Sequence, residues 1–410
     1  MTSRGVTLKV DSFGSVEDPI SKKLEEISRF TWQNENGMIV QLISYGAILT
    51  SIKVPDRTGQ LSDVVLGFDD IDGYRKKNNP YFGALVGRVA NRIARGQFIL
   101  NGEVINVAKN WNNKHALHGG IIGFDKFNFH HFIDGNVVYL TSLSLDKFEG
   151  YPGDVITTVK CELLSDNSLT MEFTATTTKP TAINLTNHSY FNLAGHETGY
   201  EEIYKHVISI NADKITETDH ESIPTGNFIS VGGTAFDLRI PKELGPAMRN
   251  LSGPGYDDNF CVNVPKGKDG DEQPIVFVSR VVHPTSGRYL EIFSNQPGVQ
   301  LYTSNFLPDP CGNIKPSSNE EYYEVDGMLT TRLEQVDVTT KEKKIPKCTE
   351  TNDENAVIGK GGVRYYKHGA FCFETQKFPD AVHHTNFPSV ILNPGKIYKH
   401  EVIYKFGIEA

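Results

Sequence analysis

The sequence has no long hydrophobic run, no basic cluster and no closely paired cysteines, and each absence excludes a class of protein. No apolar stretch is long enough to cross a bilayer, and the N-terminal residues lack the apolar core of a signal peptide. The formal net charge is −9, so the chain lacks the positive surface that nucleic-acid binding requires. The five cysteines are widely spaced and include no Cys-x-x-Cys pair, which predicts reduced thiols in a cytoplasmic protein.

Helical periodicity is nearly absent as well. No long segment places apolar residues at helical spacing, and no repeat of roughly 20–50 residues indicates a solenoid or a propeller. Strand patterns are frequent instead. In residues 155–163 and 169–175, apolar and polar side chains alternate on either side of a polar turn. These patterns predict an all-β fold.

Composition divides the chain into three parts. Residues 1–26 are polar and contain glycine, which predicts a loosely held lead-in. Residues 27–410 are expected to form a single domain, because large all-β folds can exceed the usual domain length. Within it, residues from about 308 to 363 are rich in Glu, Lys, Asn, Ser and Gly. That composition cannot bury enough surface to offset the entropy of ordering, so a mobile insertion is predicted there.

The segment Asn184–Gly195 gathers many groups that suit a sugar. It reads Asn-Leu-Thr-Asn-His-Ser-Tyr-Phe-Asn-Leu-Ala-Gly, and its apolar positions alternate with polar ones as in a half-buried strand. Such a strand would hold His188 rigidly. A histidine alone is more often a core residue whose ring is satisfied by neighbouring amides. The density of amides, hydroxyls and aromatic rings favours a catalytic role instead.

This segment resembles the signature of the aldose 1-epimerases, the galactose mutarotases. Three further segments resemble the family in the same order along the chain: Gly87–Ala94, Leu117–Lys126 and Phe373–Ala381. The resemblance extends from about residue 27 to residue 406. It implies a large antiparallel β-sandwich (the supersandwich of the mutarotases) with a sugar-binding groove across one sheet. It also implies an isomerase that interconverts the α and β anomers of hexoses such as galactose and glucose.

Two residues are candidates for the proton transfers that ring opening requires. A base must take the proton of the anomeric hydroxyl, and an acid must protonate the ring oxygen. Glu374 follows the apolar pair Cys372-Phe373, which would partly desolvate its carboxylate and raise its proton affinity. Alternation alone would equally allow a surface glutamate on an edge strand. The resemblance implies that Glu374 is the base and His188 the acid, and the ordinary pKa of histidine suits proton exchange near neutral pH.

The resemblance also assigns residues that contact the sugar. Taken alone, His118 is typical of a turn and Arg92 of a solvated face. The position after Asp257 is commonly histidine in the family and is Asp258 here. Successive strand residues point to opposite faces, so Asp258 need not face the sugar. The implied substrate-binding residues are Asn91, Arg92, His118, Asp257 and Gln296.

The reaction needs neither a metal nor a cofactor, and none is predicted. Paired histidines such as His130-His131 and His383-His384 have no third ligand nearby in the sequence. Two other functions remain open at this point. One is a sugar-binding module that has kept the groove and lost turnover, and the other is a hexose-6-phosphate 1-epimerase, which would need extra cations around the groove. The expected partner is an aldohexose, with no nucleic acid and no membrane, and the oligomeric state is open.

Overall fold

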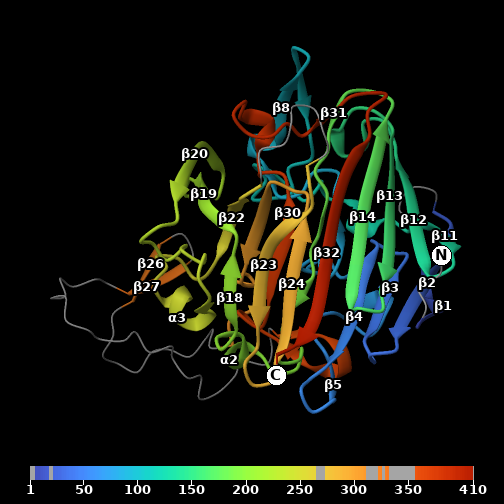
Figure 1. Ribbon diagram of the computed structural model, residues 1–410. Helices are drawn as coiled ribbons and strands as arrows, with labels where there is room; N and C mark the ends of the chain where they lie inside the picture. The colour runs from blue at the N-terminus through green and yellow to red at the C-terminus, as the bar shows by residue number, and fades with distance from the viewer. Residues whose placement is uncertain are drawn as a thin grey trace.

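The computed structural model describes residues 5–17, 22–264, 273–310 and 356–409, together with two short strands between residues 322 and 331. Antiparallel sheets make up most of it, which confirms the all-β prediction (Figure 1). Among the described residues no helix is long and apolar enough to span a bilayer. The helices are α1 (Ile71–Arg75), α2 (Tyr200–Ile203) and α3 (Leu244–Arg249).

Three larger sheets contain most of the strands. The five-stranded sheet runs β1 (Val6–Glu17), β2 (Leu24–Asn34), β3 (Ile39–Ile43), β4 (Ile48–Pro55) and β5 (Leu61–Asp63). The nine-stranded sheet runs β11 (His130–Asp134), β12 (Val137–Ser144), β13 (Val155–Leu163), β14 (Ser168–Thr177), β32 (Tyr398–Ile408), β24 (Arg288–Ser294), β23 (Val276–Val282), β18 (Val207–Ile210) and β21 (Lys242–Glu243). The six-stranded sheet runs β17 (Tyr190–Phe191), β30 (Phe371–Gln376), β25 (Gly298–Tyr302), β22 (Asp257–Val262), β19 (Ala212–Thr218) and β20 (Pro224–Ser230).

The remaining strands form separate two-stranded pairs. They are β6 (Leu85–Val86) with β16 (Thr186–Asn187), β7 (Arg92–Ile93) with β10 (Ala116–Leu117), β8 (Gln97–Leu100) with β9 (Glu103–Asn106), β15 (Thr181–Ala182) with β31 (Ile391–Leu392), β26 (Tyr322–Val325) with β27 (Met328–Thr331), and β28 (Val357–Ile358) with β29 (Arg364–Tyr365).

The hydrophobic core lies between the sheets and joins all three of the larger ones. Its largest cluster includes Trp32 from the five-stranded sheet, Phe173 from the nine-stranded sheet and Phe371 from the six-stranded sheet. Burying one such side chain contributes roughly 1.5–3 kcal/mol. The hairpin predicted from alternation is confirmed as β13 and β14, with the alternate residues of β13 buried. Figure 1 shows β32, in red, between β14 and β24, so a strand from the end of the described chain completes the nine-stranded sheet.

The N-terminal segment is more ordered than its composition predicts. Residues 6–17 form β1, which pairs antiparallel with β2 from Val6 opposite Asn34 to Glu17 opposite Leu24. Only a few side chains of β1, such as Val6 and Val16, are buried. A strand at the edge of a sheet is stabilised mainly by its backbone hydrogen bonds, which composition does not reveal. The prediction of a loosely held lead-in before Ile27 is therefore wrong for β1.

Most of the predicted insertion at residues 308–363 lies outside the described residues. Its C-terminal end, however, is packed against the five-stranded sheet. β28 pairs with β29, and the Nζ atom of Lys360 lies 2.7 Å from the Oδ2 atom of Asp63. The same ammonium donates a hydrogen bond to the carbonyl of Thr50 at 2.9 Å. Val357 and Val363 also pack against the core cluster that contains Tyr365, so both polar and apolar contacts order this end of the segment. The mobile insertion predicted up to about residue 363 therefore extends too far.

The alternation in Asn184–Gly195 predicts one half-buried strand, but the structure does not form it. The segment contributes β16 and β17, which pair with β6 and β30 respectively. Residues 181–193 are all buried, because structure covers both faces. The polar side chains are satisfied within the protein: for example, Asn187 donates to the carbonyl of Gly83 at 2.8 Å. His188 therefore lies between two short strands, within a buried segment whose backbone is held by both.

Candidate active site

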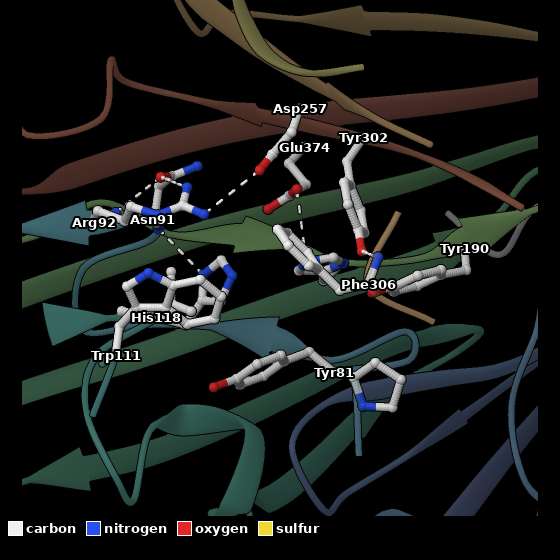
Figure 2. A pocket seen from close by; sticks show the side chains of 13 residues that line it. Tyr81, Asn91, Arg92, Trp111, His118, Tyr190, Asp257, Tyr302, Phe306 and Glu374 are labelled. Atoms are coloured by element: carbon white, nitrogen blue, oxygen red, sulfur yellow. Dashed lines mark hydrogen bonds and ion pairs between the residues drawn. The ribbon is translucent and has the colours of Figure 1, made fainter. Parts of the chain in front are cut away.

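A small cavity of about 170 Å³ brings together most of the predicted site residues. Figure 2 shows Asp257 and Glu374 on one side of it, with His118, Trp111 and Tyr81 on the other. Its walls come from segments far apart in the sequence. The lining residues are Pro80, Tyr81, Asn91, Arg92, Trp111, Leu117, His118, His188, Tyr190, Asp257, Tyr302, Phe306 and Glu374.

The register of the six-stranded sheet sets one wall of the cavity. In β22, β25 and β30, Gln300 lies opposite Glu374, and Asp257 lies opposite Tyr302. Directly opposed residues share a face of the sheet, and so do residues two apart along a strand. Asp257, Gln300, Tyr302 and Glu374 therefore all point to the same face. Asp258 pairs with Leu301 and points to the opposite face, as the sequence predicts.

Glu374 is almost completely buried, with 2% of its surface exposed. Burial raises the pKa of its carboxyl well above the ordinary value, and the nearby Asp257 raises it further, while Arg92 acts in the opposite direction. Its Oε2 atom has no hydrogen-bond partner within the protein. A buried carboxyl with a free oxygen suits the binding of a ligand hydroxyl.

His188 is held by both its backbone and its ring. Its backbone N–H donates to the carbonyl of Ala84 at 2.9 Å, and its own carbonyl accepts from Gly83 at 3.0 Å. The imidazole lies between the rings of Tyr190 and Tyr81, with centroids at 5.1 Å and 6.0 Å. Burial lowers the pKa of His188 to about 4, and its Nδ1 atom has no hydrogen-bond partner.

The two candidate proton-transfer groups face each other. The Nε2 atom of His188 lies 3.6 Å from the Oε1 atom of Glu374, which is too long for a good hydrogen bond. Burial favours the neutral form of each group. A single proton shared by the pair can reside on the carboxyl or on the imidazole. Because moving it to the imidazole changes no net charge, pH does not alter the ratio of the two arrangements.

Asn91, Arg92 and Asp257 form a connected polar group beside this pair. The Oδ1 atom of Asn91 accepts from the backbone N–H of Arg92 at 2.9 Å and from its Nη1 atom at 3.3 Å. The Nη2 atom of Arg92 lies 3.5 Å from the Oδ2 atom of Asp257. The guanidinium also lies over the ring of Trp111, at 5.2 Å from the centroid. Arg92 is thus a buried, oriented donor rather than part of a solvated face.

His118 lies in a strained turn that the following glycine makes possible. Its φ is +52°, and Gly119 has a φ of +89°. A Cβ atom on Gly119 would lie 1.9 Å from the carbonyl oxygen of Gly87, so no other residue fits there. The Nδ1 atom of His118 accepts from the backbone N–H of Asn91 at 3.2 Å. Burial, with the neighbouring His188, lowers the pKa of His118 well below its usual value, so the ring is neutral and its Nε2 atom carries the proton.

Gln296 does not line this cavity, and the prediction that it contacts the sugar disagrees with its position. Its Nε2 atom donates to Asn295 at 2.9 Å, and its side chain lies in a second cavity. Gln300 lies instead on the face of the sheet that carries Asp257 and Glu374, behind the residues that line the cavity. Its Nε2 atom donates to the Oδ1 atom of Asp257 at 2.8 Å, and its Oε1 atom has no partner. Alternation in Gly298–Tyr302 would have placed Gln300 on the face of Tyr302, which is the signal that could have identified it.

Asp258 has an unusual environment of its own. Burial and the adjacent Asp257 raise the pKa of Asp258 to about 7. One of its oxygens accepts from the backbone N–H of Asp257 at 3.1 Å. It therefore acts on the site only through Asp257.

Aromatic residues that the sequence analysis did not single out form the mouth of the cavity. Phe306 is 58% exposed and meets Trp111 edge to face, with centroids 5.8 Å apart. Tyr302 stacks on Phe306 at 6.0 Å. Flat aromatic surfaces beside polar groups suit the apolar face of a pyranose ring. Trp111 is far in the sequence from Tyr302 and Phe306, so no local sequence motif could have identified the three as one group.

One group among the described residues has the composition of a metal site. The ligand atoms of His118, His188 and Glu374 all lie within 4.8 Å of one another. Two imidazoles and a carboxylate are a common set for zinc. A metal there would occupy the lone pairs that proton transfer needs. The expectation that no metal takes part remains a prediction.

Comparison with known proteins agrees with this geometry. The family model described as aldose 1-epimerase matches residues 28–405. The chain is 41% identical to the galactose mutarotase of Bos taurus over 382 residues, covering 93% of this chain and 94% of the relative. It is 40% identical to the aldose 1-epimerase of Haemophilus influenzae over 299 residues, covering 72% and 82%. An aldose epimerase homologue from C. elegans superposes with a TM-score of 0.72 at 27% identity, covering 92% of this chain and 97% of that one. The chain belongs to the aldose 1-epimerase family.

Proposed function

We propose that the chain interconverts the α and β anomers of an aldohexose, with Glu374 as the base and His188 as the acid. Family membership supports the isomerase reaction. The observation that carries the assignment of roles is the approach of the two buried groups to 3.6 Å at the bottom of one cavity. Both groups have a free polar atom, Oε2 of Glu374 and Nδ1 of His188.

The proposed reaction starts from the arrangement in which the imidazole carries the shared proton. Glu374 then takes the proton of the anomeric hydroxyl while His188 gives its proton to the ring oxygen. The bond between the anomeric carbon and the ring oxygen breaks, and an open-chain aldehyde forms. Rotation about the adjacent carbon–carbon bond presents the other face of the carbonyl. The ring oxygen then attacks that face, its proton returns to His188, and Glu374 returns a proton to the new hydroxyl. The enzyme ends with the protonation state in which it started.

The other polar groups are assigned to binding. Arg92 and Asn91 offer donors, and Asp257 offers an acceptor, for the ring hydroxyls, while Gln300 orients Asp257 through its hydrogen bond. Arg92 is the only guanidinium or ammonium among the described lining residues, and it is already paired with Asp257. A phosphate would need cations that are free to pair with it. The cavity therefore favours a neutral sugar such as galactose or glucose over a hexose 6-phosphate.

Polarimetry on freshly dissolved α-galactose tests the proposal. Acceleration well above the buffer rate supports it. Sugar binding without acceleration would favour a sugar-binding module that has lost turnover. Acceleration confined to a 6-phosphorylated hexose would favour a hexose-6-phosphate 1-epimerase.

We also propose a cytoplasmic location. The described cysteines, Cys161, Cys261 and Cys372, are all free and buried, which is typical of a reducing compartment. Labelling of the intact protein by a thiol reagent after unfolding, with no change on prior reduction, would support this.

A further inference from the structure

A second, larger cavity lies apart from the proposed active site. Its volume is about 640 Å³. It is formed where the turn after β24 faces the residues that follow β30 and the start of β32. Gln296, which does not reach the active site, lines this second cavity. None of its lining residues is shared with the first cavity.

The charge of this cavity is positive, in a chain whose net charge is −9. The four lysines that line it are Lys214, Lys377, Lys396 and Lys399. None of the described aspartates or glutamates lines it. Lys399 is paired outside the lining, with Glu401 at 2.6 Å. Lys214 lies over the ring of Phe228 at 4.0 Å, and Lys396 is exposed. Lys214, Lys377 and Lys396 therefore bring ammonium groups to the cavity without an ion-pair partner among the described carboxylates.

Lys377 is the most informative of the four. Its Nζ atom donates to the carbonyl of Ser389 and lies 5.8 Å from the centre of the ring of Tyr398. No carboxylate among the described residues is within ion-pair distance of it. Burial alone lowers the pKa of Lys377 to about 8, which records the cost of removing an ammonium from water without a countercharge. An anion in the cavity would offset that cost.

The remaining walls indicate more than a bare ion. Asn263, Asn295 and Gln296 provide amides. The Oε1 atom of Gln296 is buried without a partner, and as an acceptor it suits a hydroxyl of an organic group rather than the phosphate itself. Ile397 and Phe378 provide apolar surface. Lysine is a common phosphate ligand that acts as a point charge. The combination of spaced ammonium groups, amides and an apolar wall suits a phosphate attached to a small organic group.

We propose that this cavity binds a small phosphate-bearing metabolite, with Lys377 and Lys396 as its principal cationic contacts. The site adjoins the strand that carries Glu374. The backbone of Lys377 exchanges hydrogen bonds with the side chain of Asn184, at 2.9 Å and 3.1 Å, and the carbonyl of Asn184 accepts from Ala90 at 2.7 Å. Ala90 directly precedes Asn91 of the first cavity. The second cavity thus contacts the segments that position the first.

Isothermal titration calorimetry of the whole protein tests this proposal without reference to turnover. The probes are inorganic phosphate, glucose 6-phosphate and uridine diphosphate, each titrated with and without saturating galactose. We expect at least one probe to bind, with galactose present as well as absent. Equal affinity for all three would mean that the phosphate alone is recognised, and tighter binding of the larger probes would mean that the apolar wall takes part. Absence of binding by every probe at millimolar concentration would overturn the proposal.

Variants locate the site. Lys377→Gln and Lys396→Glu should each weaken binding by about tenfold or more, because each removes a charge-assisted contact. Lys396 is exposed, so its variant should fold even if Lys377→Gln does not. Lys77→Gln, which changes an exposed lysine outside the cavity, is the matched control and should bind as the parent does. Undiminished binding by Lys396→Glu, or displacement of the probe by galactose, would place the phosphate elsewhere and contradict the proposal.

Discussion

The Nε2 atom of His188 lies 3.6 Å from the Oε1 atom of Glu374, although the two residues belong to segments far apart in the sequence. The contact is too long to lock the two groups together, and both are buried. Each is therefore available to a ligand that enters between them.

Glu374→Gln should lower kcat by about 10²- to 10⁴-fold, because the amide keeps the shape of the side chain but cannot accept the proton. Binding of galactose, measured by calorimetry, should change little. Glu35→Gln, an exposed glutamate in the turn between β2 and β3, is the control and should keep the parental rate. A rate for Glu374→Gln within tenfold of the parent would show that another group is the base.

The rate should vary little with pH across the neutral range. Burial lowers the pKa of His188 to about 4 and raises the pKa of Glu374 well above its ordinary value, so the pair keeps its single proton between these limits. Below the lower limit a second proton binds and removes the base. Above the upper limit the only proton is lost and there is no acid. A polarimetric pH profile of kcat/KM should show this plateau, and an acid limb centred near the ordinary histidine pKa would contradict it.

Chelators should not affect the reaction, whereas zinc should inhibit it. His118, His188 and Glu374 could together ligate the ion, and the bound metal would occupy the groups needed for proton transfer. We expect inhibition competitive with galactose and reversed by EDTA. Loss of activity on treatment with EDTA alone would show that the enzyme requires a metal.

Gln300→Ala should raise KM for galactose by about tenfold or more, because it removes a hydrogen bond to the charged Asp257 and leaves that carboxylate less well oriented. Gln296→Ala should change KM less than twofold, since Gln296 lies in the other cavity. The two variants form a matched pair, measured by steady-state polarimetry. A larger rise in KM for Gln296→Ala than for Gln300→Ala would support the sequence-based prediction that Gln296 contacts the sugar.

Lys360→Met should destabilise the fold by about 3–5 kcal/mol, because it leaves Asp63 buried without its countercharge. Neither residue lines the proposed active-site cavity, so the remaining folded protein should turn over normally. Urea unfolding gives the free energy, and a paired Lys360→Met, Asp63→Asn variant should recover part of it. A change below 1 kcal/mol would mean that this end of the segment contributes little to stability.

The sequence predicted the all-β fold and the hairpin of β13 and β14, and most of its candidate site residues line one cavity. The resemblance to a known family singled out Glu374, His188 and Asp257, and all three line one cavity. Their roles in the reaction stay predictions. Because side chains alternate along a strand, the sequence also predicted that Asp258 lies on the opposite face from Asp257, and the register confirms it. The choice between Gln296 and Gln300 depends instead on where β25 begins and on its register with β30, which are tertiary facts. The aromatic mouth is likewise formed by residues that meet only after folding.

The nine-stranded sheet also has a consequence for biosynthesis. β32 pairs with β14 on one side and with β24 on the other, yet it is made long after β14. While the ribosome is still producing the intervening chain, the open edge of β14 exposes unpaired backbone groups that can recruit other strands. Chaperone capacity during this interval should therefore determine how much of the nascent enzyme matures and how much aggregates.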